Sequence, residues 1–289
     1  MRVLVTGAKG QLGVELLDVL GHDHEVIGLD LPELDITKAE ATRVIADPCP
    51  AWVVHAAAWT DVDGCERDPE RAVLVNGEGT RRVAEACRTV GAGLVYLSTD
   101  YVFDGRKGAP YVETDPVSPL SAYARSKVAG EEAVRAVAPR WAIVRTAWLF
   151  GVSGKNFVKA IVEKAAAGGP VRVVDDQVGS PTYARDLAEA IAQLVSRGLT
   201  GTYHVTNAGS CSWHEFARAI LKEAGLGHVP VAPLTTAELG RPAPRPAFSV
   251  LANTAWAAAG LPPVRPWPEA LAAMLTAWKK TDTFASVLP

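Results

Sequence analysis

The sequence predicts an α/β protein with a doubly wound parallel sheet and a smaller lobe toward its C-terminus. Short, continuously apolar segments alternate with amphipathic ones from the first residue onward, as in parallel sheets that helices cover on both faces. A glycine-rich turn follows the first apolar segment. Beyond about residue 149 the alternation loosens, and prolines become dense between residues 226 and 267, which indicates less regular structure.

Six apolar segments are the expected strands of the sheet. They span residues 3–5, 25–29, 52–55, 94–97, 142–145 and 202–205. Amphipathic patterns predict helices at about residues 11–20, 38–45, 71–90 and 184–196, around Tyr123, and at about 268–279. Right-handed crossovers then build a doubly wound sheet. We expect residues 1–149 and 171–206 to form the sheet domain, and residues 150–170 and 207–289 to form the lobe.

Composition narrows the classes of function. The 289 residues carry a net charge of −3 and no block of Lys or Arg, which argues against a nucleic-acid partner. The four cysteines are scattered without zinc-like spacing, so no metal is expected. No apolar run approaches the ~20 residues that span a bilayer. The first residues are interpreted as a strand rather than a signal peptide, so we expect a cytoplasmic protein without a membrane partner.

Gly7, Gly10 and Gly13 form a G-x-x-G-x-x-G turn between the first strand and the first helix. Glycines let the backbone turn tightly and approach a diphosphate, whose negative charge the helix N-terminus stabilises. The position of the turn at the start of a βαβ unit supports this interpretation. We therefore expect a dinucleotide-binding Rossmann domain in which Gln11 and Leu12 also contact the cofactor.

Further residues are expected around the cofactor. Asp30 ends the second strand, where a carboxylate accepts hydrogen bonds from the adenosine ribose and repels a 2′-phosphate. No Arg immediately follows it, which slightly favours NADH over NADPH. Asp35 and Ile36 are expected near the adenine edge. The small residues after the third strand would let the cofactor lie close to the backbone, and they are Ala56, Ala57 and Ala58.

Tyr123 and Lys127 are expected to share one face of a helix, because they stand four residues apart. A phenol is a poor acid or base at neutral pH, but a nearby cation lowers its pKa and suits it to proton transfer. Thr99 follows the fourth strand, at the sheet edge where such proteins bind ligands. Its hydroxyl is expected to hydrogen-bond a substrate oxygen beside the phenol.

In this order the motifs resemble those of the extended short-chain dehydrogenase/reductases. The resemblance implies an active set of Thr99, Tyr123 and Lys127, and a cofactor-binding Asn76 in the helix beneath the site. Over nearly the whole chain, the sequence further resembles the dTDP-4-dehydrorhamnose reductase family. The matching segments are GQLG (10–13), LDIT (34–37), HAAAWT (55–60), STDYVFDG (98–105), PLSAY (119–123), RTAWL (145–149), NF (156–157), DQVGSPT (176–182) and residues 241–249.

The second resemblance implies an oxidoreductase that uses NADPH or NADH to reduce the C4 ketone of dTDP-4-dehydro-L-rhamnose to dTDP-L-rhamnose. It also implies a homodimer. Tyr123 would protonate the developing alkoxide, Lys127 would lower the phenol pKa and hold the nicotinamide ribose, and Thr99 would orient the carbonyl. The substrate-binding residues implied by the resemblance are Thr60, Val62, Thr99, Tyr101, Trp148, Asn156 and Arg241.

Two other functions remain open at this point. A nucleotide-sugar 4,6-dehydratase is excluded, because it would need a second carboxylate after Asp100, where Tyr101 stands instead. A 4-epimerase uses the same three catalytic residues and would keep NAD bound through turnover. The non-catalytic, NADP-binding regulatory subunit of methionine adenosyltransferase also resembles this chain, although the intact set of Thr99, Tyr123 and Lys127 argues against that function.

Overall fold

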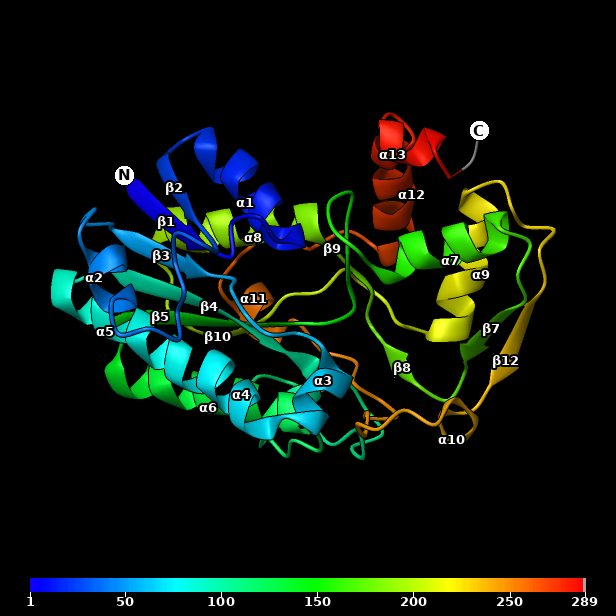
Figure 1. Cartoon of the computed structure of the whole chain (residues 1–289), viewed down its shortest axis with the longest axis horizontal. Helices are drawn as coiled ribbons and strands as arrows, with labels where there is room; N and C mark the ends of the chain where they lie inside the picture. The colour runs from blue at the N-terminus through cyan, green and yellow to red at the C-terminus, as the bar shows by residue number, and fades with distance from the viewer. Residues whose placement is uncertain (288–289) are drawn as a thin grey trace.

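Six parallel strands form the central sheet of the computed structural model, which describes residues 1–287 (Figure 1). They are β1 (Arg2–Thr6), β2 (Glu25–Leu29), β3 (Trp52–His55), β4 (Gly93–Thr99), β5 (Arg140–Thr146) and β10 (Gly201–His204), in the order β10-β5-β4-β3-β1-β2. The chain runs outward from β1 to β2 and returns past β1 to β3, so the winding reverses between β1 and β3. Ligands bind at such a switch point. The predicted doubly wound fold is confirmed.

Helices cover both faces of the sheet (Figure 1). Helices α1 (Gln11–Gly21) and α8 (Ala184–Arg197) lie on one face, and α2 (Ala41–Ala46), α5 (Thr80–Val90) and α6 (Ala122–Val137) lie on the other. Alternate residues of each strand enter opposite cores. In β1, Val3 and Val5 pack with α1 and α8, whereas Leu4 packs with α5. Burial of both faces explains why the strands are continuously apolar in the sequence.

The helix expected at residues 71–90 is divided into three parts. A short α4 (Pro69–Val73) is followed by a π-helical turn, η1 (Leu74–Gly79), and then by α5. Asp68 caps α4 by accepting a hydrogen bond from the Arg71 amide. The π-helical turn introduces one additional residue into the helix. It turns Asn76 toward the loop that follows β3.

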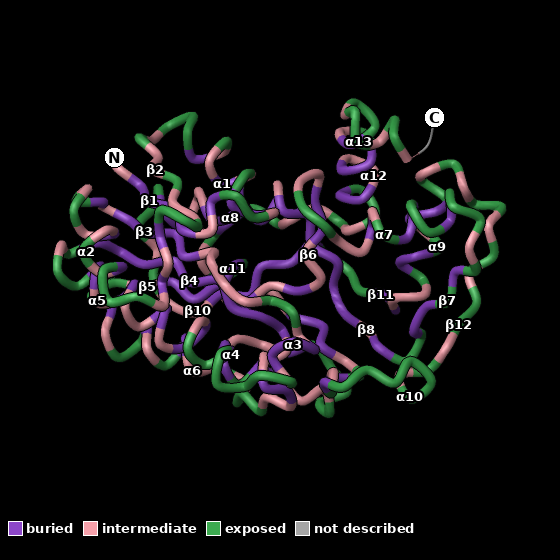
Figure 2. The backbone as a smooth tube through the Cα atoms, viewed as in Figure 1, coloured by how far each residue is buried: buried purple, intermediate pink, exposed green. Residues whose placement is uncertain are grey.

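A second hydrophobic core lies in the C-terminal lobe, where Figure 2 shows buried backbone on the inward side of the helices. Its helices are α7 (Phe157–Ala166), α9 (Trp213–Glu223) and α12 (Trp267–Trp278). The last was expected, as was a helix start near His214, whereas α7 was not. Strand β7 (Val171–Val174) pairs with β12 (Val231–Leu234), and its apolar side packs in this core. Residues 171–183 therefore pack with the lobe and not with the sheet domain, and we propose a boundary near residue 184.

Short elements connect these units. They are α3 (Val62–Arg67), η2 (Asp100–Val102), β6 (Leu149–Phe150), β8 (Val178–Gly179), β9 (Thr182–Tyr183), β11 (Cys211–Ser212), α10 (Thr236–Leu239), α11 (Thr254–Ala258) and α13 (Asp282–Ala285). Through Trp256, α11 returns to the core beneath α1 and α8. Within the described chain, no helix is both long enough and apolar enough to cross a membrane.

Candidate active site

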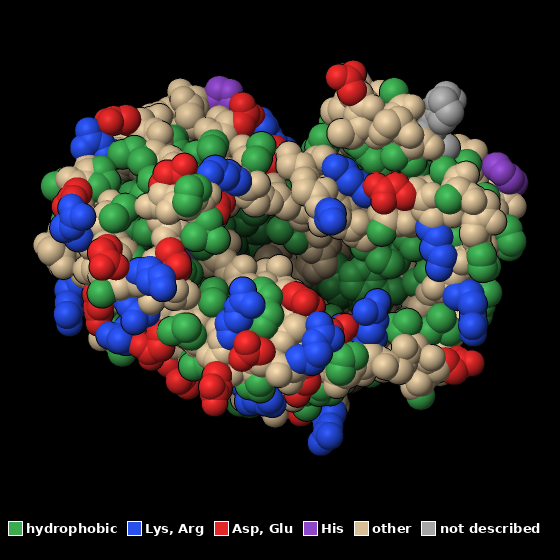
Figure 3. Space-filling view, viewed as in Figure 1, with side chains coloured by type: hydrophobic (Ala, Val, Ile, Leu, Met, Phe, Trp, Pro, Cys, Tyr) green, Lys and Arg blue, Asp and Glu red, His purple; other side chains and the backbone are tan. Residues whose placement is uncertain are grey.

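Two cavities lie beyond the carboxyl ends of the strands, and Figure 3 shows the face of the molecule hollowed between the sheet domain and the lobe. The first, which we name the β4 cavity, has a volume of about 420 Å³ and is lined in part by Thr99, Tyr123 and Lys127. The second, the β2 cavity, has a volume of about 600 Å³ and is lined in part by Asp30 and Asp35. The glycine turn and the loop after β3 border both cavities, which together form one elongated site.

Close packing explains two of the three glycines in the turn. Gly7 has a φ of +71°, which favours glycine, and a Cβ there would lie 2.7 Å from the Ala57 nitrogen. A Cβ on Gly13 would lie 2.1 Å from the Gly7 carbonyl oxygen, so a larger residue would push α1 away from β1. Gly10 occupies the N-cap of α1, and its amide donates to the Gly7 carbonyl at 3.0 Å. The turn therefore borders the cavities with backbone that no side chain covers.

Unpaired polar atoms in the β4 cavity fit a dinucleotide cofactor. Gln11 Oε1 and Thr146 Oγ1 are buried without a hydrogen-bond partner in residues 1–287, and both residues line the cavity. Because buried polar atoms are normally paired, these two indicate a polar ligand. Gln11 is also the first residue of the 11-residue helix α1, whose N-terminus stabilises a negative charge such as a diphosphate. Leu12 lies on the same wall.

Local hydrogen bonds hold the two carboxylates of the β2 cavity. Asp30 accepts from the amides of Lys9 and Leu31, both at 2.8 Å. Asp35 accepts from the hydroxyl and the amide of Thr37 at 2.7 and 2.9 Å, and these bonds hold the pKa of Asp35 below its ordinary value. Both side chains are thereby fixed beside the cavity as hydrogen-bond acceptors, a role that suits ribose hydroxyls or an adenine amino group.

The remaining wall of the β2 cavity contains four residues that were expected there, which are Ile36, Ala56, Ala57 and Ala58. It also contains Arg71 and Leu74, which were not expected. The Arg71 guanidinium lies 4.6 Å from the centroid of the Trp59 ring, a cation–π contact. The position of Arg71 depends on the short helix that precedes the π-helical turn, and the sequence pattern gave no sign of that turn.

Tyr123 lies in the first turn of α6, which the Ser121 side chain caps. Burial raises the pKa of Tyr123 and the charge of Asp100 raises it further, whereas a hydrogen bond with Thr99 lowers it. The net effect is a raised pKa, because burial outweighs the opposing hydrogen bond. That Lys127 lowers the phenol pKa stays a prediction. A phenol in this environment stays protonated at neutral pH and is equipped to donate a proton.

The Lys127 side chain is buried beneath the β4 cavity. Its ammonium lies 4.3 Å from the centroid of the Tyr96 ring. Burial lowers the pKa of Lys127 to about 7, and the charge of Glu131 opposes that shift. Glu131 is itself fully buried and accepts hydrogen bonds from Arg145 at 2.8 and 2.9 Å and from Arg135 at 2.8 Å, so most of its charge is balanced by other cations. The Lys127 ammonium is therefore available to donate hydrogen bonds to acceptor groups on a ligand.

Asn76 lies beneath the site, in the helical segment where the resemblance placed it. Within residues 1–287 it borders neither cavity, and its side chain is buried. Its amide nitrogen donates to the Trp59 carbonyl at 3.0 Å and to Ser126 Oγ at 2.9 Å, and its oxygen accepts from the Trp59 amide at 2.8 Å. These bonds tie the loop after β3 to α6. Asn76 therefore positions the site from behind, and its contact with the cofactor stays a prediction.

Trp148 and Thr60 are substrate residues implied by the resemblance that do line the β4 cavity. Trp148 has a φ of +46°, a strained conformation for a bulky residue and one that often marks a functional site. Its ring stacks on Trp213 with the centroids 3.6 Å apart and the planes inclined by 10°. A Cβ on Gly179 would lie 2.5 Å from the indole of Trp148, so the absence of a side chain at Gly179 leaves room for the ring.

Tyr101 stands beside the catalytic residues although, in the described chain, it does not border the β4 cavity. Its ring meets Tyr123 edge to face, with centroids 6.2 Å apart and planes inclined by 83°. Its amide donates to Thr99 Oγ1 at 3.2 Å. Val62, the first residue of α3, is half-buried and is also absent from the described cavity walls.

Asn156 and Arg241, which the resemblance also implied, make other contacts. Asn156 caps α7 by accepting from the Lys159 amide at 3.2 Å, and its side chain donates to the Gly151 carbonyl at 2.8 Å. Arg241 is exposed and donates to Asp63 at 3.2 Å. Neither residue borders the cavities within residues 1–287.

Two titratable residues of the β4 cavity were missed as site residues. Lys155 is exposed on its wall. Asp100 is buried there and accepts from Ser249 Oγ at 2.5 Å and from Thr99 at 3.0 Å. Burial raises the pKa of Asp100 to about 7, and those two hydrogen bonds oppose the rise. Its position directly after Thr99 was the available signal. In residues 1–287, no group of three or more His, Cys, Asp or Glu side chains is arranged to hold a metal.

Known proteins resemble this chain both in sequence and in fold. A family model described as RmlD substrate binding domain matches residues 1–280. The chain belongs to this family. The dTDP-4-dehydrorhamnose reductase of Streptomyces griseus is 47% identical to it over 278 residues, which cover 93% of this chain and 91% of the relative. The resemblance to the dTDP-4-dehydrorhamnose reductases is confirmed.

Two further relatives extend the comparison for this RmlD-family chain. The crystal structure of dTDP-4-dehydrorhamnose reductase from Bacillus anthracis in complex with NADP has 40% sequence identity and a TM-score of 0.92, and the match covers 96% of this chain and 99% of the other. A probable dTDP-4,6-dihydroxy-2-methyloxan-3-one 4-ketoreductase of Streptomyces antibioticus is 44% identical over 275 residues, which cover 94% of this chain and 93% of the relative.

Proposed function

We propose that this protein reduces the C4 ketone of dTDP-4-dehydro-L-rhamnose to dTDP-L-rhamnose, with NADPH or NADH as the reductant, in dTDP-rhamnose biosynthesis. The observation that carries the proposal is the convergence of Thr99, Tyr123 and Lys127 on one cavity that also contains the glycine turn. The names of the relatives support the substrate. The protein is accordingly an NAD(P)H-dependent oxidoreductase.

The chemistry divides between the cofactor and the chain. A reduced nicotinamide supplies the hydride that reaches C4 of the sugar. Tyr123 donates its proton to the alkoxide oxygen that develops there, so the carbonyl becomes a secondary alcohol. Its raised pKa keeps the phenol protonated until that oxygen becomes a stronger base. Thr99 would turn its hydroxyl from Asp100 to donate a hydrogen bond that orients the carbonyl. Lys127 would hold the nicotinamide ribose and stabilise the negative charge that Tyr123 acquires when it gives up its proton.

We further propose the binding residues along the elongated site. The glycine turn would hold the cofactor diphosphate through Gly7, Gly10, Gln11, Leu12 and Gly13. The β2 cavity would hold the adenosine through Asp30, Asp35, Ile36, Ala56, Ala57 and Ala58. The sugar would contact Thr60, Thr99, Tyr101 and Trp148. Val62, Asn156 and Arg241 would approach the substrate only if it extends beyond the β4 cavity, as the dTDP moiety would.

The cellular setting is proposed from the family resemblance alone. We infer a cytoplasmic enzyme that works as a homodimer and whose partner is a small nucleotide-sugar. Sedimentation of the purified protein tests the dimer directly. A monomer at micromolar concentration that retains full activity would contradict it.

A spectrophotometric assay tests the function. The purified protein is mixed with NADPH or NADH and with dTDP-4-dehydrorhamnose, and oxidation of the cofactor is followed by absorbance. Tyr123→Phe removes only the phenolic oxygen and keeps the ring that packs edge-on against Tyr101. Loss of a general acid should lower kcat by about 100- to 10,000-fold, while the dissociation constant of NADPH stays unchanged. An unaltered rate in Tyr123→Phe would refute Tyr123 as the proton donor.

A related substrate is the second candidate. The 44% identical relative from Streptomyces antibioticus is named for a different dTDP-linked 4-keto sugar, which makes another 4-keto deoxysugar a specific alternative. Measuring kcat/KM for both sugars separates the two possibilities. A 4-epimerase would instead retain NAD after purification and convert a nucleotide-sugar without net oxidation of NADPH. A regulatory subunit would bind the cofactor and reduce neither ketone.

A further inference from the structure

The N-terminus of α1 lacks the side-chain cap that α3, α4, α6 and α7 have. In those four helices an amide of the first turn donates to a side-chain oxygen, which belongs to Asp61, Asp68, Ser121 and Asn156 in that order. Gly10 occupies the corresponding position of α1, and the first turn of α1 contains no acidic residue. The first amides of a helix have no partner within the helix, and its positive end attracts an anion. This end of α1 is therefore open to an anionic ligand.

The loop at residues 151–156 joins β6 to α7 and packs against the same end of α1. A Cβ on Gly154 would lie 3.3 Å from Gln11 Cβ, and a Cβ on Gly151 would lie 3.3 Å from Gln11 Cγ. The side chain of Asn156 closes the loop by donating to the Gly151 carbonyl at 2.8 Å, and it also caps α7. The loop backbone is therefore held beside the first residue of α1.

Lys155 directly follows Gly154 and lines the β4 cavity together with the glycine turn. Its side chain is exposed, and within residues 1–287 its ammonium makes no hydrogen bond or ion pair. The described wall of this cavity contains one other Lys or Arg side chain, that of Lys127, which is buried against the Tyr96 ring. Lys155 therefore supplies the exposed positive charge of the β4 cavity.

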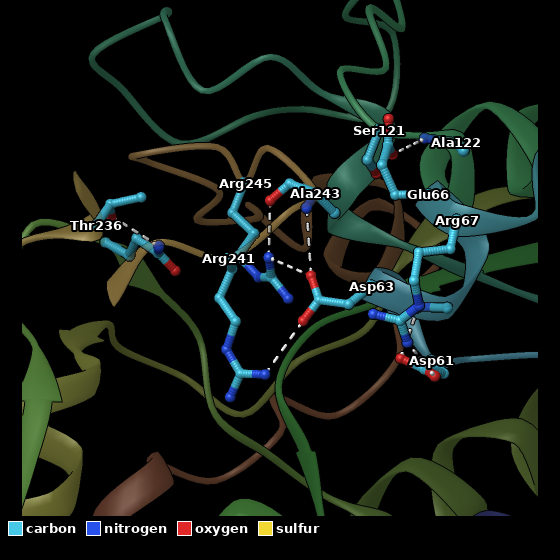
Figure 4. Close-up of polar contacts among 12 residues, drawn as sticks. Asp61, Asp63, Glu66, Arg67, Ser121, Ala122, Thr236, Arg241, Ala243 and Arg245 are labelled. Atoms are coloured by element: carbon cyan, nitrogen blue, oxygen red, sulfur yellow. Dashed lines mark hydrogen bonds and ion pairs between the residues drawn. The ribbon is translucent and has the colours of Figure 1, made fainter. Parts of the chain in front are cut away.

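Other cations that could serve an anionic ligand are already paired with carboxylates. Lys9, which belongs to the glycine turn, forms an ion pair with Glu33 at 3.1 Å. In the lobe, Arg241 and Arg245 both point toward Asp63, which accepts from them at 3.2 and 3.0 Å (Figure 4). A cation that is paired in this way must first give up its partner to bind a phosphate. The unpaired lysine on the cavity wall has no such cost.

We propose that Lys155 binds the diphosphate of the dinucleotide cofactor, so that the lobe and the glycine turn hold the cofactor from two sides. The ammonium of a lysine is a flexible point charge that suits phosphate oxygens. The diphosphate of the nucleotide-sugar has the same chemistry, but the loop that carries Lys155 packs against Gln11, at the open end of α1. The proposal rests on the proposed placement of the cofactor along the elongated site.

Fluorescence titration of the substrate-free protein with NADPH tests the proposal. Lys155→Met removes the charge and keeps an unbranched side chain, so the dissociation constant should rise by about 5- to 20-fold. Lys155→Arg keeps the charge and should stay within about threefold of the wild type. Lys164→Met is the matched control, because Lys164 is exposed on α7 and does not line the described cavity walls. Equal dissociation constants for Lys155→Met and Lys164→Met would overturn the proposal.

Calorimetric titration with dTDP distinguishes the two sources of diphosphate. With NADPH saturating, the dissociation constant of dTDP should be the same for Lys155→Met and the wild type. A loss of dTDP binding with unchanged NADPH binding would assign the charge to the nucleotide-sugar, and the proposal would be wrong. Neither titration needs a keto sugar. If Lys155→Met bound NADPH more weakly but the wild type reduced no dTDP-linked ketone, the proposed function would fail and the role of Lys155 would stand.

Discussion

The buried ammonium of Lys127 should make the cofactor-free protein less stable than a variant that lacks it. Burial lowers the pKa of Lys127 from an ordinary value near 10.5 to about 7. The folded protein therefore binds fewer protons than the unfolded chain between these two pH values, and its stability rises with pH across that window. At pH 7 the difference corresponds to about 4 kcal/mol of lost stability.

Lys127→Met keeps an unbranched chain of similar length and removes the charge. The variant loses the contact between the ammonium and the Tyr96 ring, which is worth about 1 kcal/mol. We therefore expect a net gain of about 3 kcal/mol, or about 5 °C in Tm for a chain of this size. Activity should be lost, because nothing would hold the nicotinamide ribose. The stability gained and the function lost would thus come from the same atom.

Thermal unfolding of cofactor-stripped protein at two pH values checks this reasoning. The gain should be largest at pH 7 and should shrink by more than half at pH 9.5, where unfolded lysine also begins to lose its proton. Lys38→Met is the control, because Lys38 is exposed, and its Tm should stay within about 1 °C of the wild type. A Lys127→Met protein no more stable than the wild type at pH 7 would refute the claim that this ammonium is energetically costly.

Two glycines offer further tests of the elongated site. Gly7→Ala would place a Cβ 2.7 Å from the Ala57 nitrogen at a φ of +71°; NADPH binding measured by fluorescence should weaken by about tenfold or more, and unchanged binding would show that the turn does not contact the cofactor. Gly179→Ala would crowd the Trp148 indole at 2.5 Å; the KM of the keto sugar should rise by about tenfold while NADPH binding is retained. A change in NADPH binding alone would assign Trp148 to the cofactor instead.

The sheet and its covering helices were predictable because their information is local. Burial on two faces makes a strand continuously apolar, and one buried face gives a helix its periodicity. The glycine turn was predictable for the same reason, since Gly7 and Gly13 are required by contacts within a single βαβ unit. Spacing alone also placed Tyr123 and Lys127 on one helix face, and the structure brings both to the β4 cavity.

Contacts between distant segments were not predictable from such patterns. Asn156 stands in a matching motif but caps a helix, and Arg241 is bound by a carboxylate about 180 residues away in the sequence. The raised pKa of Tyr123 was not predictable, because spacing gives only the distance to a cation, whereas burial depends on the whole fold. The lobe was recognised mainly by its loss of regularity, and α7 was not predicted. The capping box of Ser212 and Glu215 was an available signal for α9, whose start near His214 was expected although its length was not.

The π-helical turn at Leu74–Gly79 has a consequence for how this chain tolerates change in its length. Each helical residue advances the rotation of the helix by about 100°. Loss of one residue here would therefore rotate α4 relative to α5 and move the side chains of one helix away from the residues they contact, without replacing any side chain. The bonds of Asn76 to Trp59 and Ser126 would be broken as surely as by replacing Asn76 itself. Along this stretch, the number of residues should therefore matter to the active-site floor as much as the identity of Asn76.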